Sequence, residues 1–186
     1  MISSVRSTGH PFPNARALQP APETPDSADA ELTTEYAIGD RLLTVCLTIF
    51  IFRGEPDAYY NRHVLLYFSS PDDPTMFETV HAQRQDAHAP WNVYHLHAKT
   101  DWSEPSNYHA HVNAGAVLVR GDALMMPVAA VAATDVTGKH ADGGWNCQNF
   151  VLEGLQTLVR LGLQTQDWYD AVEEELLDKI IEGAVG

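Results

Sequence analysis

One cysteine of this sequence stands at the start of a predicted helix, where a nucleophile would be well placed. In Asp142-Gly-Gly-Trp-Asn-Cys-Gln-Asn-Phe150, a glycine pair and Asn146, a favourable N-cap residue, come directly before Cys147. Thiolate is the reactive form of cysteine, and the N–H groups of a helix N-terminus lower a thiol pKa and bind a developing oxyanion. We therefore expect Cys147 to be a catalytic nucleophile, with packing as a small apolar residue as the alternative.

A nucleophilic cysteine needs a general base, and histidines precede Cys147 on predicted strands. His63 opens one of these strands, which would expose an edge of its ring at the end of a sheet. His95 and His97 are two residues apart on a later strand, so they project to one face. Either of these two could orient the His63 ring as the third group of a triad.

Three segments occur in an order that is typical of a known group of proteins. They are His63-Val-Leu-Leu-Tyr-Phe68, Val93-Tyr-His-Leu96 and Asn146-Cys-Gln-Asn-Phe-Val151. This arrangement resembles the permuted papain-like proteins, such as the lecithin:retinol acyltransferase-like and NlpC-type groups, which carry His-Trp, Val-x-His-Leu and Asn-Cys-Glu-His-Phe-Val in that order. The resemblance covers about residues 40 to 165. The layout is also similar to uncharacterised fungal families.

The resemblance implies a role for each of these residues. Cys147 would be the nucleophile, His63 its general base and acid, and His95 the orienting residue. The expected reaction is acyl transfer through a thioester, as a hydrolase or acyltransferase acting on an amide, ester or thioester of a small molecule or peptide. We expect no cofactor. The residues expected to contact the substrate are Trp145, Asn146, His97 and Tyr60.

Two other classes of function compete with this hypothesis. The pairs His95/His97 and His109/His111, with Asp101, supply enough ligands for a zinc or other transition-metal site. The second pair is also consistent with exposed polar residues on a loop. The third class is a non-catalytic binding module for a small molecule or protein on the same fold.

The rest of the sequence predicts the elements that would position these residues. Expected strands span residues 41–52, 63–68, 91–98 and 116–120, and expected helices span residues 125–133, 147–161 and 168–182. Strands followed by helices indicate an α+β fold, here a small antiparallel sheet packed against the cysteine-bearing helix. Cys46 is expected to be an inert core residue, and His81 and His88 to lie in a solvated connection without a role.

Composition and charge exclude several functions. The 11 Lys and Arg against 25 Asp and Glu give a net charge of −14, which repels nucleic acid. The apolar runs are too short for a membrane span, and prolines interrupt the first 30 residues where a secretory signal would lie. We expect a cytoplasmic protein, for which a homodimer is one option. We expect a poorly ordered arm over residues 1–34, followed by a single domain over residues 35–186.

Overall fold

An antiparallel sheet and three helices make up the fold of the residues that the structure, a computed structural model, describes: 41–86, 88–139 and 144–185. The strands are β1 (Leu42–Phe52), β2 (His63–Ser69), β3 (Phe77–Gln83), β4 (Asn92–His97) and β5 (Tyr108–Arg120). The helices are α2 (Met126–Ala132), α3 (Cys147–Arg160) and α4 (Gln166–Ile181), with short 3-10 turns η1 (Tyr59–Asn61) and η2 (Gly121–Ala123). The expected α+β class with an antiparallel sheet is confirmed.

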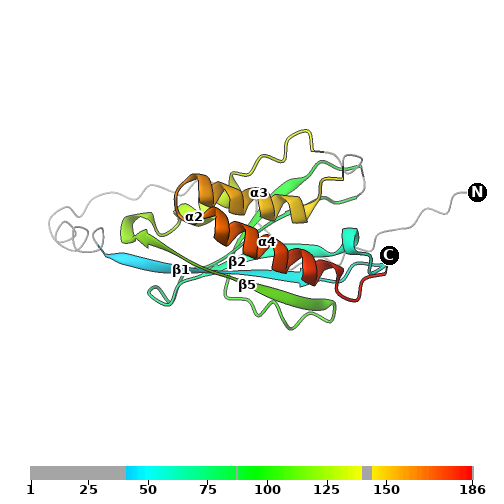
Figure 1. The fold of residues 1–186 in the computed structure, drawn as a ribbon, viewed down its shortest axis with the longest axis horizontal. Helices are drawn as coiled ribbons and strands as arrows, with labels where there is room; N and C mark the ends of the chain where they lie inside the picture. Colours follow the sequence, from blue (N-terminus) through cyan, green and yellow to red (C-terminus); the bar gives the residue numbers. More distant parts are fainter. Residues whose placement is uncertain (1–40, 87, 140–143, 186) are drawn as a thin grey trace, which may run out of the picture.

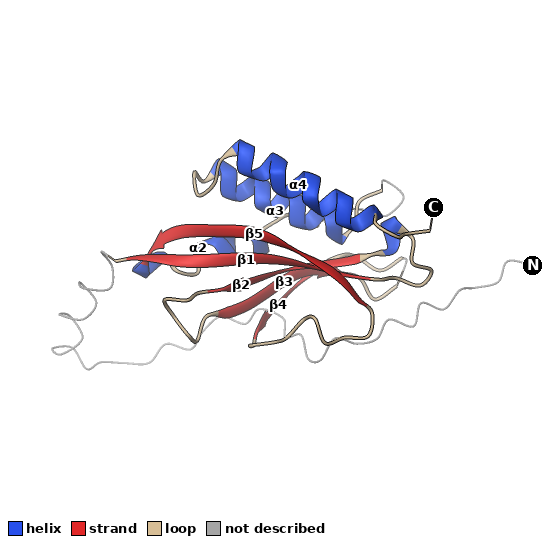
Figure 2. Ribbon diagram, turned by 60° about the horizontal axis from the view of Figure 1, so that its bottom comes forward, coloured by secondary structure: helices blue, strands red, loops and turns tan. Residues whose placement is uncertain are grey.

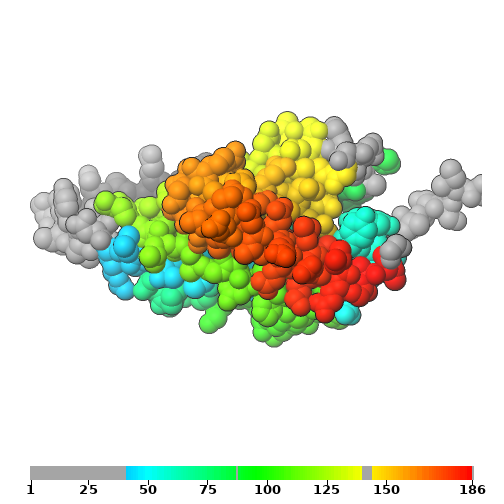
Figure 3. Space-filling view, in the orientation of Figure 1, coloured from blue at the N-terminus to red at the C-terminus, as the bar shows by residue number. Residues whose placement is uncertain are grey.

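The sheet has the strand order β4-β3-β2-β1-β5, and all neighbouring strands run antiparallel. Strand β1 therefore lies between β2 and the long edge strand β5, while β4 forms the other edge. Helices α3 and α4 cover one face of this sheet (Figures 1 and 2), and Figure 3 shows how they form much of the surface on that side. No helix in the described part of the chain is long and apolar enough to cross a lipid bilayer.

The main core lies between the helices and the sheet. Strand β1 alternates, so Val45, Leu47, Ile49 and Ile51 point toward the helices and are fully buried. Helix α3 meets them with an apolar stripe at helical spacing. That stripe consists of Cys147, Phe150, Val151, Leu155 and Leu158.

A smaller apolar cluster lies on the other face of the sheet. Phe52, Leu65 and Trp102 are its buried members. Partly buried residues from four strands pack against this cluster: Phe50, Tyr67, Leu96 and Tyr108. Cys46 points to this outer face and is half-buried. The expectation that Cys46 is an inert core residue is therefore wrong, because strand alternation turns it away from the helices.

The sequence missed β3 and most of β5. Residues 77–83 form a strand because tertiary partners bury their polar side chains: the Trp102 Nε1–H, for example, donates to the Thr79 hydroxyl over 3.1 Å. Strand β5 begins at Tyr108 rather than at residue 116, so His109 and His111 lie on a strand and not on a loop. The expected arm, residues 1–34, lies outside the described residues.

Candidate functional site

Cys147 is the first residue of helix α3, whose start is fixed by a capping box. The Asn146 side-chain oxygen accepts the backbone N–H groups of Gln148 and Asn149 at 2.8 and 3.4 Å. In return, the Asn149 side-chain oxygen accepts the Asn146 N–H at 2.9 Å. The cap satisfies the donors at the helix end and holds Cys147 in one orientation.

The Cys147 thiol packs against the chain on either side of His63. Its Sγ donates to the Arg62 carbonyl over 3.8 Å, and the residue is 6% exposed. Burial raises the pKa of the Cys147 thiol to about 11. Backbone N–H groups, including that of Val64, and the charge of Arg84 act in the opposite direction and lower this pKa, but by less. The thiol of the unliganded protein is therefore protonated at neutral pH.

A buried arginine fixes the carbonyl that receives this thiol. The Arg62 guanidinium donates to both carboxylate oxygens of Asp57 at 2.9 and 2.8 Å. Its Nη1 also donates to the carbonyl oxygens of Lys179, Ile180 and Glu182, at 3.1, 3.1 and 2.8 Å. The arginine thereby ties the start of β2 to the C-terminal end of α4, where carbonyl groups carry partial negative charge.

The ring of His63 is held by a second histidine. His63 Nε2 and His81 Nδ1 share a hydrogen bond of 3.1 Å, and the ring centres lie 5.0 Å apart. Burial lowers the pKa of His63 to about 3, with the charge of His81 as a smaller cause, and burial lowers the pKa of His81 to about 4. Both rings are therefore neutral at pH 7.

The structure brings His81, and not His95 or His97, to His63. His95 Nε2 and His97 Nδ1 instead each hydrogen-bond one carboxylate oxygen of Glu78, at 2.6 and 2.5 Å. His95 lies beside Val80 in the ladder, on the helix-covered face, whereas His81 points to the outer face. His81 was assigned to a solvated connection, and this is wrong: it lies on β3 and is 5% exposed.

His63 and Cys147 lie at the same end of the sheet but on different faces of it. His63 lies opposite Phe52 in the ladder, so its ring shares the outer face, while Cys147 belongs to the core under the helices. Both nevertheless line one pocket of about 320 Å³ beside the starts of β2 and α3. In Figure 1 the start of α3 lies near η1, and the Gln148 side chain donates to the Tyr59 carbonyl there, at 2.7 Å.

The same pocket holds three of the four expected substrate-binding residues. Tyr60, Trp145 and Asn146 line it, and His97 does not. Arg84 and Trp91 also line it, and neither is among the four residues expected to contact the substrate. They follow β3 and precede β4, so they meet only because those two strands pair, which no local motif signals.

The two His-x-His pairs do not form a common site. His95 and His97 lie on β4 and His109 and His111 on β5, at opposite edges of the sheet. His109 Nε2 hydrogen-bonds the Lys179 carbonyl at 3.1 Å, and His111 pairs with the Tyr108 hydroxyl at 2.7 Å. Across residues 41–86, 88–139 and 144–185, no group of three or more His, Cys, Asp or Glu side chains is arranged to hold a metal ion.

Comparisons with protein-family models, with curated proteins and with solved structures found no match to this chain.

Proposed function

We propose that this protein is a cysteine-dependent acyl-transfer enzyme, a hydrolase or acyltransferase of permuted papain-like type. One observation carries the proposal: a capped helix start places Cys147 against the backbone on both sides of His63, in a pocket that both residues line. His63 is in turn hydrogen-bonded to His81. Thiol catalysis uses a nucleophile, a base and an orienting group, and Cys147, His63 and His81 are the residues that we assign to these three roles.

The reaction proceeds through a thioester. His63 accepts the Cys147 proton as Sγ forms a bond to the substrate carbonyl carbon, and backbone N–H groups at the start of α3 stabilise the oxyanion. The bond to the leaving group then breaks, and the leaving group takes the proton from His63. Water or an amine finally attacks the thioester, regenerating the thiol.

His81 acts as a positioning residue in this scheme. It binds Nε2 of His63. In this scheme the other ring nitrogen, Nδ1, exchanges a proton with the thiol. Because both histidines are neutral at pH 7 and the thiol is protonated, the proton moves during the attack itself. The resting protein holds a neutral pair rather than a thiolate and an imidazolium.

Reaction with p-nitrophenyl acetate, a neutral activated ester, tests this proposal. The expected result is one nitrophenolate released rapidly per chain, with the acetyl group located on Cys147 by mass spectrometry. Cys147→Ala should abolish the burst, and His63→Ala should slow it by about 10² to 10⁴-fold, the usual contribution of a general base. Cys46→Ser is the matched control and should leave the burst intact. An acetyl group that never reaches Cys147 would overturn the proposal.

A non-catalytic binding module is the second candidate, favoured by the burial of the thiol and its pKa of about 11. Such a module would keep the pocket but have no use for a nucleophile. It predicts no burst with the ester, and equal ligand affinity for the native protein and for Cys147→Ala.

A further inference from the structure

The sulfur of Cys147 lies between groups that favour its two protonation states. Burial has the largest effect and raises the pKa of the thiol, whereas the backbone N–H groups of Val64, Cys147 and Gln148 hydrogen-bond to the sulfur and lower this pKa. The Arg62 carbonyl oxygen, in contrast, accepts the S–H over 3.8 Å and can bind only the protonated form. The strength of this one acceptor therefore influences how readily the thiol loses its proton.

A second donor holds the same carbonyl oxygen. The Gln148 side-chain Nε2 donates to the Arg62 carbonyl over 3.0 Å and to the Tyr59 carbonyl over 2.7 Å. Both partners can only accept a hydrogen bond, so the nitrogen of the amide, and not its oxygen, belongs between them. An amide N–H at these distances is a stronger donor than an S–H group. Gln148 is therefore the stronger of the two side-chain donors to the carbonyl that Cys147 shares.

The Gln148 side chain also spans the turn that lines the pocket. Tyr59 is the first residue of η1 and Arg62 is its C-cap. Tyr60 and Asn61 lie between the two carbonyls that Gln148 binds, and both line the pocket. Because Gln148 follows the cysteine directly in α3, its half-buried side chain fixes η1 relative to the start of that helix.

We propose that Gln148 is a positioning residue, which occupies the Arg62 carbonyl and thereby keeps that oxygen from holding the Cys147 proton. A donor bound to a carbonyl oxygen reduces the negative potential that the oxygen exerts on neighbouring atoms. Without the amide, the carbonyl would bind the S–H group more strongly and the thiol would ionise less readily. This inference rests on the proposed function, in which Cys147 loses its proton as it attacks, and it assigns control of that step to Gln148.

Alkylation by iodoacetamide at pH 9 tests the inference, because the thiolate is the form that reacts. The rate at Cys147 is divided by the rate at Cys46 of the same molecules, which corrects for reagent concentration and pH. Gln148→Met keeps nearly the size of the side chain but removes its donor. We expect this variant to lower the corrected rate by about 3- to 10-fold, the effect of one hydrogen bond of ordinary strength.

Two further variants show whether the effect comes from the donor. Gln148→Lys can again donate to both carbonyls although its side chain is longer, so its rate should equal or exceed the native rate. Gln156→Met makes the same exchange further along α3, where Gln156 donates to the Gln166 side chain over 3.1 Å, and should leave the rate unchanged. Circular dichroism and the melting temperature establish that each variant is folded, and Gln148→Ala replaces Gln148→Met if the latter is not.

The outcomes separate this inference from the proposed function. If the native protein takes up an acetyl group on Cys147, but Gln148→Met is alkylated as fast as the native protein or faster, the inference alone is wrong. If alkylation slows in Gln148→Met, but no ester acetylates Cys147, the proposed function alone is wrong. If iodoacetamide labels Cys147 in urea and not in the native protein, the pocket does not admit reagents to the thiol, and both proposals are wrong.

Discussion

Two imidazoles share a hydrogen bond at the pocket, where a carboxylate would have brought a charge. Because burial lowers the pKa of His81 to about 4, His81 stays neutral and cannot stabilise a protonated His63 by charge. Its contribution is to hold the ring and to decide which nitrogen carries the proton. Any effect of a His81 substitution on the rate should therefore depend on whether the new side chain can still hydrogen-bond to His63.

The first prediction concerns His81 and His95. His81→Ala should slow acetylation of Cys147 by about 10- to 100-fold, because the His63 ring loses its orientation. His81→Gln, which can still hydrogen-bond, should recover part of the rate. His95→Ala is the control, since His95 binds Glu78 on the other face of the sheet, and its rate should equal that of the native protein. Equal losses in His81→Ala and His81→Gln would contradict an orienting role.

At the scale of elements, the position of Cys147 depends on how α3 packs against its neighbours. Helix α3 contacts β2 and β3 below it and α2 beside it. Gly154 faces α2, and a Cβ there would come within 2.8 Å of Val131 Cγ1. Val131 is fully buried and β-branched, so it has little freedom to move away.

Gly154→Ala should therefore destabilise the protein by about 1 to 2 kcal/mol. Overpacking costs about 1 to 3 kcal/mol, and the gain in helix propensity, about 1 kcal/mol, offsets only part of it. Urea unfolding measures the change. Because Val131→Ala removes the atom that clashes, the double variant should be more stable than the sum of the two single changes indicates. Strict additivity would show that the contact does not limit packing.

Arg62 is the other link between elements, joining the start of β2 to the end of α4. Arg62→Met should cost about 3 kcal/mol, because the carbonyls at the end of α4 lose their donor and Asp57 loses its partner. Hydrogen exchange should accelerate most in the last turn of α4. Arg62→Lys keeps the charge but not the fork of donors, so its loss should be intermediate. An unchanged last turn in Arg62→Met would contradict this role.

The strength of the local pattern decided which elements could be predicted. Strand β1 and helix α3 carry unbroken apolar periods, and Asn146 marks the start of α3, so the sequence placed Cys147 at a helix N-terminus. Strand β3 has no such period, because Glu78 and Thr79 are buried by partners from distant segments. Because the sequence did not predict β3, it also did not predict that His81, which lies on β3, is the partner of His63. Arg84 and Trp91 likewise depend on pairing that only the folded chain provides.

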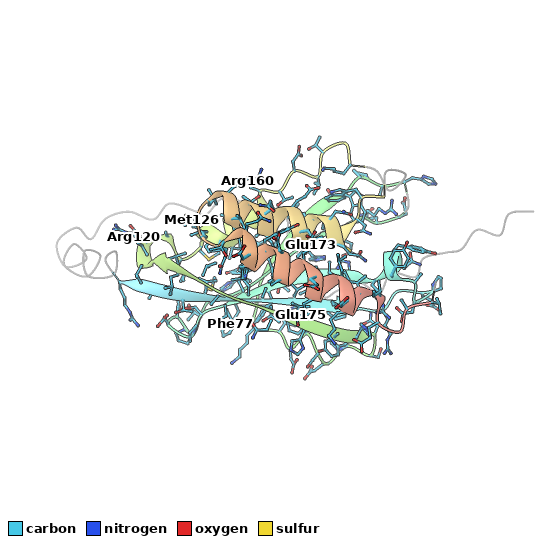
Figure 4. All side chains as sticks on the ribbon, viewed as in Figure 1. Phe77, Arg120, Met126, Arg160, Glu173 and Glu175 are labelled. Carbon is cyan, nitrogen blue, oxygen red and sulfur yellow. The ribbon has the colours of Figure 1, made fainter. Side chains whose placement is uncertain are left out.

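At the scale of the whole molecule, buried histidines make the fold of this acidic chain sensitive to acid. The chain has a net charge of −14, and acidic residues such as Glu173 and Glu175 lie along α4 on the helical side (Figure 4). His81, in contrast, is buried and neutral. Unfolding allows His81 to take up a proton at mildly acidic pH, which favours the unfolded state.

The pH prediction follows from the pKa of His81, which falls from 6.5 to about 4 on folding. The stability associated with the neutral residue is complete above pH 6.5 and is lost as the pH falls toward 4. The loss is about 1.4 kcal/mol per pH unit, or about 3 kcal/mol at pH 4. Urea unfolding at pH 7 and pH 4.5 should show a smaller difference for His81→Gln than for the native protein. The exposed His88→Gln serves as control, and identical pH dependence in all three proteins would contradict the prediction.

The bonds of Arg62 also set an order of events during synthesis. Its acceptors on α4 lie 117 to 120 residues further along the chain. While the ribosome still encloses that helix, the turn before β2 is untethered, and the carbonyl that receives the Cys147 thiol has no fixed place. A nascent chain arrested with a tunnel-spanning linker fused after residue 178 should therefore expose Cys147 to thiol reagents, and one with the same linker fused after residue 186 should protect it.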